Sequence, residues 1–95
     1  MSEIITAAVT ELREKLGDGF DGSAKFRIEG EGAIVIDGSG VHASDEDADV
    51  TLTADTDTFK GILSGDIDPT SAFMSGKLSV DGDMGTAMKL GSLLG

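Results

Sequence analysis

Residues 71–90 read SAFMSGKLSVDGDMGTAMKL, and their pattern changes from helical to extended and back to helical. The Asp-Pro pair at 68–69 predicts a short helix that ends at Gly76, because proline suits the first helical position. Alternating apolar and polar residues over 77–81 predict a strand. Asp83 is a favourable N-cap and predicts a last helix through the remaining apolar positions. We therefore expect a helix, a strand and a helix in this part of the chain.

The preceding residues predict one long helix, four strands and a second helix. Apolar residues at helical spacing indicate the long helix, and alternation or β-branched runs indicate the strands. The expected elements are a helix over 2–16, strands over 24–29, 33–36, 41–43 and 50–54, and a helix between Asp55 and Gly65.

This order of elements predicts the fold class. Short turns between the first strands favour antiparallel neighbours, and the helices between the fourth and fifth strands permit a crossover connection. We expect an α+β fold with a five-stranded mixed, mostly antiparallel sheet that is covered on one face by helices. A chain of 95 residues has room for one modest core, so residues 1–95 are expected to form a single domain.

Composition excludes several kinds of function. The chain has no Cys and one His, which argues against a disulfide framework, a thiolate nucleophile and any site with two imidazoles. Eighteen acidic residues against seven basic ones give a net charge of −11. We therefore expect no nucleic-acid partner and weak or no binding to anionic membranes, since both need a basic face.

Four short motifs resemble known sites, and each fails a structural requirement. Residues 17–22 match G-x-G-x-x-G but follow a helix and precede a strand, the reverse of a nucleotide site. Residues 75–77 resemble the end of a phosphate loop, but they also run from a helix to a strand, and Leu78 replaces the magnesium-binding hydroxyl. The aspartates within 45–49 have the spacing of a calcium loop, but the Gly and Glu that such a loop needs are absent. No serine that could pair with His42 lies in a nucleophile elbow. We expect no catalytic residue, metal or cofactor.

The most apolar part of the sequence lies between Phe73 and Leu94. Met74, Met84 and Met88 fall within it, and the last helix has a wider apolar face than packing on one side requires. Methionine fills gaps in ordinary cores, and it also repacks around irregular guests. Two interpretations stay open: a filled core, or an apolar cavity under the last helix that holds a lipid-like ligand.

Residues 71–90 resemble the signature of the sterol carrier protein type-two family of lipid-transfer domains. The shared pattern is Ser-Ala-Phe, then Gly-Lys-Leu, then Gly-Asp-Met, then Ala-Met-Lys-Leu. Upstream, residues 48–53, Phe59, 63–65 and Pro69 also match. Before residue 48 only the order of elements agrees.

The resemblance implies a hydrophobic tunnel between sheet and helices, and a non-catalytic carrier of sterols, fatty acyl chains, acyl-CoA or related lipids. It places two residues of the short helix and two of the fifth strand on the tunnel wall, with three residues of the last helix as its roof. These expected ligand-binding residues are Phe73, Met74, Leu78, Val80, Met84, Ala87 and Met88. Lys77 and Lys89 are expected to be exposed.

The chain departs from the family in its acidity, which disfavours collision with anionic bilayers and favours a protein partner. An alternative function is an interaction domain that docks an enzyme of lipid metabolism or forms a homodimer through Leu90, Leu93 and Leu94. The sequence shows no secretory signal and no peroxisomal tripeptide, and we therefore expect a cytoplasmic location.

Overall fold

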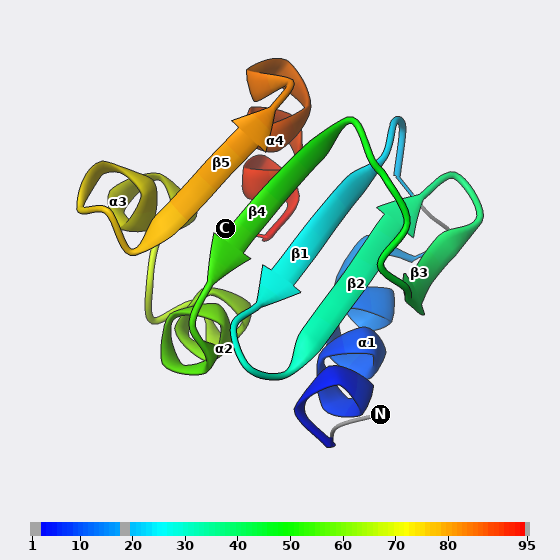
Figure 1. Cartoon of the computed structure of the whole chain (residues 1–95), viewed down its shortest axis with the longest axis horizontal. Coiled ribbons are helices and arrows are strands. Elements are labelled where there is room, and N and C mark those ends of the chain that lie inside the picture. Colours follow the sequence, from blue (N-terminus) through cyan, green and yellow to red (C-terminus); the bar gives the residue numbers. More distant parts are fainter. Residues whose placement is uncertain (1–2, 18–19, 95) are drawn as a thin grey trace.

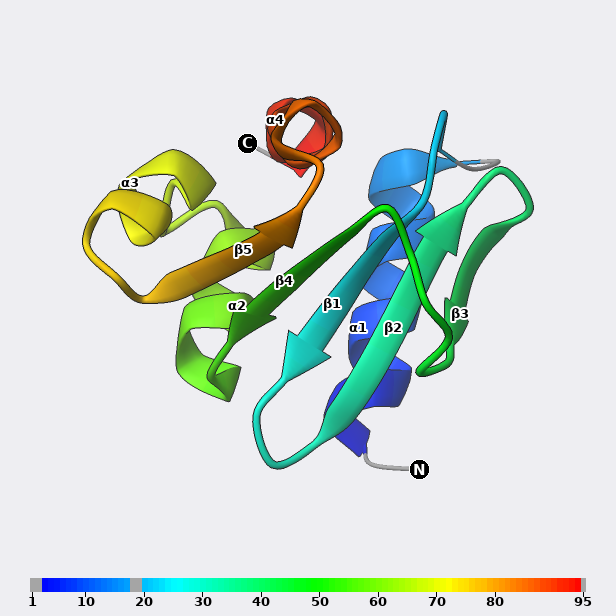
Figure 2. The same ribbon diagram turned by 45° about the horizontal axis from the view of Figure 1, so that its top comes forward.

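The computed structural model describes residues 3–17 and 20–94 and arranges them as one five-stranded sheet with helices on one face (Figures 1 and 2). In chain order the elements are α1 (Glu3–Leu16), β1 (Ala24–Ile28), β2 (Gly32–Asp37), β3 (Gly40–Ala43), β4 (Val50–Ala54), α2 (Thr56–Ser64), α3 (Pro69–Met74), β5 (Leu78–Gly82) and α4 (Met84–Leu94). The α+β class, the five strands and the mixed sheet are confirmed. Ser2, expected in the first helix, and positions 18 and 19 of the Gly-rich segment lie outside the described residues.

The sheet has the strand order β3-β2-β1-β4-β5, and its one parallel pair among the described strands is β1 with β4. The crossover connection that the helices between the fourth and fifth strands permit is not formed, because β4 and β5 pair antiparallel. α2 and α3 lie beside the end of β4 at which β5 begins, so the chain turns back instead of crossing the sheet (Figure 1). The parallel pair arises instead because residues 44–49 carry the chain from β3 past β2 and β1 to β4.

Alternation along the strands separates the two faces of the sheet. Phe26 of β1 faces the helices and packs on Phe59 of α2, with ring centroids 5.1 Å apart. Its neighbours in register, Ile34 on β2 and Leu52 on β4, are also buried. The core therefore lies between the sheet and the layer of helices, which is the side on which any internal ligand must bind.

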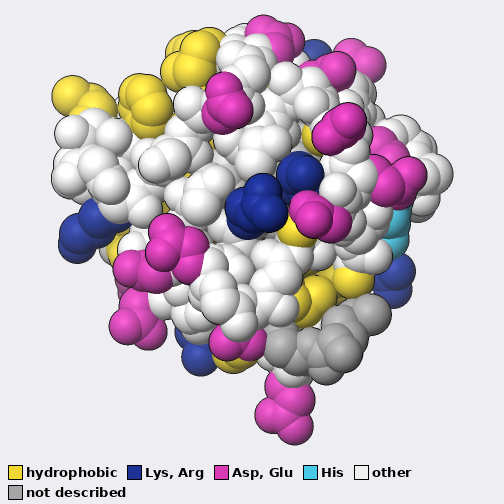
Figure 3. Space-filling model, viewed as in Figure 1, with side chains coloured by type: hydrophobic (Ala, Val, Ile, Leu, Met, Phe, Trp, Pro, Cys, Tyr) yellow, Lys and Arg dark blue, Asp and Glu magenta, His cyan; other side chains and the backbone are white. Residues whose placement is uncertain are grey.

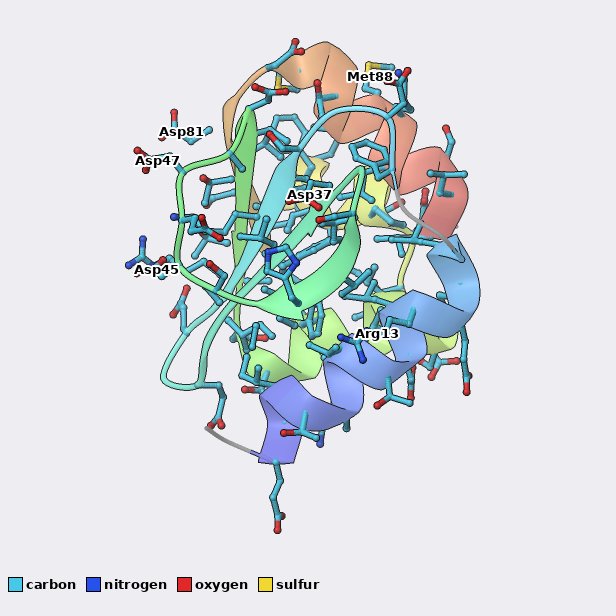
Figure 4. The ribbon with its side chains drawn as sticks, turned by 90° about the vertical axis from the view of Figure 1, so that its right-hand side faces the viewer. Arg13, Asp37, Asp45, Asp47, Asp81 and Met88 are labelled. Atoms are coloured by element: carbon cyan, nitrogen blue, oxygen red, sulfur yellow. The ribbon has the colours of Figure 1, made fainter. Side chains whose placement is uncertain are left out.

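The opposite face of the sheet is polar and has no helix over it. Lys25 and Arg27 of β1 project there, and Figure 3 shows basic side chains at the centre of this face with acidic ones around them. Lys25 is only 7% exposed, and its Nζ donates to the Asp45 carboxylate at 3.2 Å. Asp45, Asp47 and Asp81 project from this side, away from α4 (Figure 4).

Local hydrogen bonds set the ends of the helices. Gly17 adopts a left-handed φ of +64° after α1, as expected of a glycine at this position, and its N–H donates to the Arg13 carbonyl. The Asp55 carboxylate accepts from the Thr58 N–H at 2.7 Å and caps α2. Asp68 occupies the N-cap position of α3, but its side chain makes no capping bond.

Candidate functional site

An apolar pocket of about 630 Å³ lies between the sheet and the helices α3 and α4. The register of β4 and β5 builds one wall, because Leu52 stands opposite Val80 and Ala54 opposite Leu78 on the helix-facing side. Helix α4 packs against β1, β4 and β5 and supplies the facing wall. The apolar residues that line the pocket are Phe26, Leu52, Ile62, Pro69, Phe73, Met74, Leu78, Val80, Met84, Ala87, Met88, Leu90 and Leu94.

All seven residues predicted from the sequence line this pocket, but they lie at different depths. Leu78 and Ala87 are buried, whereas Phe73 and Met84 are 41% and 45% exposed. Met74 and Met88 are 80% and 71% exposed and lie where the pocket opens at the surface. Figure 3 shows hydrophobic side chains gathered beside β5, between α3 and the start of α4. An enclosed tunnel and the binding role of these residues stay predictions.

Sequence reasoning did not select the deepest part of the pocket. Phe26 and Leu52 come from the central strands, and Ile62 comes from α2. All three are at most 4% exposed, so they form the inner end of the cavity. Their alternation and helical spacing marked them as core, and that pattern does not distinguish a core residue from the wall of a cavity.

Part of the expected dimer surface is wrong. Leu90 and Leu94 are 1% and 4% exposed and pack within the chain, where both line the pocket. Leu93 is 51% exposed and does not line it. At about 100° per residue, Ala87, Leu90 and Leu94 lie within about 60° of one another around α4 and form its buried face, and Leu93 lies outside that sector. A homodimer stays a prediction, and of these three residues only Leu93 is available to it.

Two capping aspartates fix the helices that border the pocket. The Thr86 hydroxyl donates to the Asp83 carboxylate at 2.6 Å, and the Gly85 N–H donates to it at 3.1 Å. These bonds hold the pKa of Asp83 below its ordinary value, with the Thr86 hydroxyl as the largest cause. The Thr58 N–H lowers the pKa of Asp55 in the same way at the start of α2. Both carboxylates are therefore ionised at neutral pH.

A second pocket, of about 560 Å³, lies between α1 and α2. Its lining mixes apolar residues with the charged side chains Glu11, Asp57, Lys60 and Asp66. Burying an apolar ligand there would desolvate those charges. The pocket beside β5 is therefore the better candidate for an apolar ligand.

The other motifs form no site in the part of the chain that the structure describes. His42 Nε2 lies 3.7 Å from Glu46 and 4.0 Å from Asp37, and the nearby hydroxyls of Ser39 and Ser44 donate to these carboxylates. No group of three or more His, Asp or Glu side chains among the described residues could hold a metal ion. Nor does any described helix have the length and apolar character needed to cross a bilayer.

Comparison with known proteins places this architecture in a family. The model of the SCP-2 sterol transfer family matches residues 5–95, and the chain belongs to that family. The chain is 50% identical over 48 residues to hydroxysteroid dehydrogenase-like protein 2 of Xenopus tropicalis, covering 50% of this chain and 12% of that protein. It is 45% identical over 56 residues to human sterol carrier protein 2, covering 59% of this chain and 10% of that protein. The chain thus spans about a tenth of the length of these curated relatives.

Solved structures of the family share the fold. The sterol carrier protein 2 of Aedes aegypti, solved in complex with palmitate, has a TM-score of 0.77 and 24% identity, and the match covers 99% of this chain and 96% of that one. Palmitated SCP2L2 of Aedes aegypti has a TM-score of 0.79 and 20% identity over 99% of this chain and 95% of that one. The apo form of the Yarrowia lipolytica protein has a TM-score of 0.68 and 20% identity, with 92% and 73% covered.

Proposed function

We propose that this chain is a non-catalytic lipid-binding domain whose pocket beside β5 takes up a sterol, a fatty acyl chain or a related apolar body. The observation that carries the proposal is the uniformly apolar inner wall of the pocket, supplied by three strands and three helices. Membership of the SCP-2 sterol transfer family and the palmitate complex of a structural relative support it.

The size of the pocket suits such a ligand. Its volume of about 630 Å³ falls within the range of about 300–1,000 Å³ that is typical of small-molecule sites. Each buried methylene contributes about 0.8 kcal/mol, so a long chain reaches micromolar affinity, equivalent to about 8 kcal/mol, with no specific polar contact. Affinity in this pocket would therefore come from the length of apolar chain that it covers.

The charge of the chain bears on how a ligand is delivered. A net charge of −11 repels anionic bilayers, so we propose exchange with a protein partner in the cytoplasm in preference to collision with membranes. The curated relatives are about ten times longer than the matched segment, and one is named as a hydroxysteroid dehydrogenase-like protein. An enzyme of lipid metabolism is accordingly the kind of partner to expect.

One observation favours a second candidate, a domain that only docks another protein. Leu93 is an exposed large apolar residue outside the pocket, and it is suited to a contact with an enzyme or a second copy. In that case the pocket would stay empty or collapse, and the apolar end of α4 would carry the function.

Two matched variants on α4 separate the candidates. Met88→Glu places a carboxylate where the pocket opens, and Leu93→Glu places one on the same helix outside the pocket. Both sites are more than half exposed, so unfolding free energies should change by at most about 0.5 kcal/mol. Met88→Glu should weaken binding of an apolar ligand about tenfold or more, because the new charge must be desolvated, and Leu93→Glu should not.

The measurement is native mass spectrometry of freshly purified protein, followed by thermal-shift titration with fatty acids, fatty alcohols, sterols and isoprenoid quinones. A bound ligand raises the melting temperature by mass action. No co-purified lipid, no shift with any ligand and a dimer lost only in Leu93→Glu would refute the carrier and establish the docking domain.

A further inference from the structure

We propose that the pocket selects its ligand by head-group charge, taking neutral or cationic amphiphiles in preference to fatty-acid anions of equal chain length. This inference rests on the proposed function, and it names the class of lipid that the same pocket accepts. It concerns the polar groups at the pocket, where the head group of a bound amphiphile must find its hydrogen bonds.

The polar side chains at the pocket offer acceptors. Among the described lining residues they are Asp68, Thr70 and Ser92, and Asp68 is the only acidic one. The Ser92 hydroxyl donates to the Met88 carbonyl at 3.1 Å, which leaves its lone pairs free to accept. The Asp68 carboxylate accepts from the Ser71 hydroxyl at 3.3 Å and has further lone pairs. A ligand hydroxyl or ammonium can donate to these oxygens, whereas a carboxylate cannot.

No Lys, Arg or His is among the described residues that line the pocket. Lys25 and Arg27 lie on the opposite face of β1, and Lys60 lines the pocket between α1 and α2. Lys89 on α4 pairs with Asp21 at 3.4 Å. A carboxylate head group would therefore meet no cation from the walls.

The remaining basic side chains also act elsewhere. Arg13 Nε donates to the Val41 carbonyl at 3.0 Å, Lys77 interacts with the Asp55 carboxylate, and His42 lies between Asp37 and Glu46. Lys15 belongs to the last turn of α1 and does not line the pocket.

The start of α4 does not replace the missing cation. An unoccupied helix N-terminus would attract an anion, but Asp83 already accepts from the Gly85 N–H and the Thr86 hydroxyl there. Asp68 lines the pocket, and Asp83, which precedes the lining residue Met84, adds a second negative charge at the start of α4. A fatty-acid anion would lose hydration and face like charge, whereas an alcohol would lose little and an amine would gain attraction.

The experiment compares dodecanoate, dodecanol and dodecylamine, which have the same alkyl chain and differ in charge, by calorimetric titration below their aggregation limits. At about pH 8 the alcohol and the amine should bind about tenfold more tightly than the anion, because only the anion carries an unpaired buried charge. On acidification towards pH 5 the affinity for dodecanoate should rise as its carboxyl group takes up a proton, and that for dodecanol should stay level.

A matched pair of variants assigns the selectivity to the pocket. Asp68→Asn keeps a favourable N-cap residue and removes the charge at the pocket. Asp66→Asn makes the same change in net charge at the second pocket. Asp68→Asn should raise dodecanoate affinity several-fold, lower that of dodecylamine and leave dodecanol unchanged, while Asp66→Asn should alter none of them.

The outcomes separate the two proposals. If dodecanoate binds as tightly as dodecanol at about pH 8, or if both variants respond alike, head-group selection by this pocket is overturned and the lipid-binding function stands. If none of the three ligands binds, the lipid-binding function itself fails, and the selectivity fails with it.

Discussion

Leu90 lies on the wall of the pocket and is 1% exposed, so its truncation measures how much empty space adjoins it. Leu90→Ala removes three carbon groups, which at about 0.8 kcal/mol each amount to about 2.4 kcal/mol of lost burial. In a packed core a cavity penalty is added, and the total for Leu→Ala reaches about 2–5 kcal/mol. Because one side of Leu90 already borders a pocket, we expect a loss near the lower limit, about 2–3 kcal/mol.

The assay is equilibrium unfolding in urea, followed by circular dichroism, for the wild type, Leu90→Ala and Met88→Ala. Met88 is the matched control, because it lines the same pocket from the same helix but is 71% exposed. Its truncation should cost at most about 0.5 kcal/mol. The unfolding midpoint of Leu90→Ala should fall with an unchanged slope, and its melting temperature should drop by about 10–20 °C.

Two results would refute this reasoning about Leu90. A loss above about 4 kcal/mol would show that Leu90 is enclosed on all sides and that the interior has no adjoining space. A loss below about 1 kcal/mol would show that α4 does not press Leu90 against the sheet. The first result would remove the pocket on which the proposed function depends, and the second would contradict the packing of α4 that forms its wall.

Three further predictions concern stability. Gly82→Ala should lower the free energy of unfolding more than Gly30→Ala does. Both glycines have positive φ, but a Cβ at 82 would collide with the backbone of residues 49 and 50, whereas a Cβ at 30 would meet no atom. Equal urea midpoints for the two variants would contradict this prediction. Hydrogen bonds from Thr58 and Thr86 hold the pKa values of Asp55 and Asp83 below their ordinary value, so the stability that these caps contribute is present above the ordinary pKa and is lost as the pH falls through the lowered pKa. Unfolding midpoints measured between about pH 6 and 2 should therefore fall, and an Asn variant at both positions should fall less steeply; equal slopes would be evidence against the two caps. Lys25→Met should change the free energy of unfolding, measured by calorimetry, by at most about 1 kcal/mol. An apolar side chain of similar length can replace a buried ammonium whose partner, Asp45, is 67% exposed. A loss above about 2 kcal/mol would contradict this prediction.

Local sequence patterns predicted the elements and the faces of the strands. Alternation in residues 24–28 and 50–54 assigned Phe26 and Leu52 to the buried side, and the structure confirms both. The pairing of β1 with β4 was not predictable in this way, because it joins residues far apart in the chain. Alternation specifies which side of a strand is buried, and it does not specify the neighbour.

The extent to which each pocket residue is buried was also not predictable from the sequence. Met88 and Leu90 are both apolar residues of one helix, yet one is largely exposed and the other is fully buried. They lie two residues apart, on opposite sides of α4, and because apolar residues occupy both sides the spacing does not show which side meets the sheet. Whether the space between the layers is filled depends on side chains from six elements together, which no local pattern contains.

The order of the chain has a consequence for biosynthesis. The strands β1 to β4 and the helices α1 and α2 precede residue 65, while β5 and α4 come from residues 78–94. A nascent chain can therefore assemble four strands on the ribosome while Phe26 and Leu52 still lack their cover from α4. During that interval the incomplete interior is open to water and to any chaperone or aggregating neighbour, and the packing of α4 on the sheet ends it.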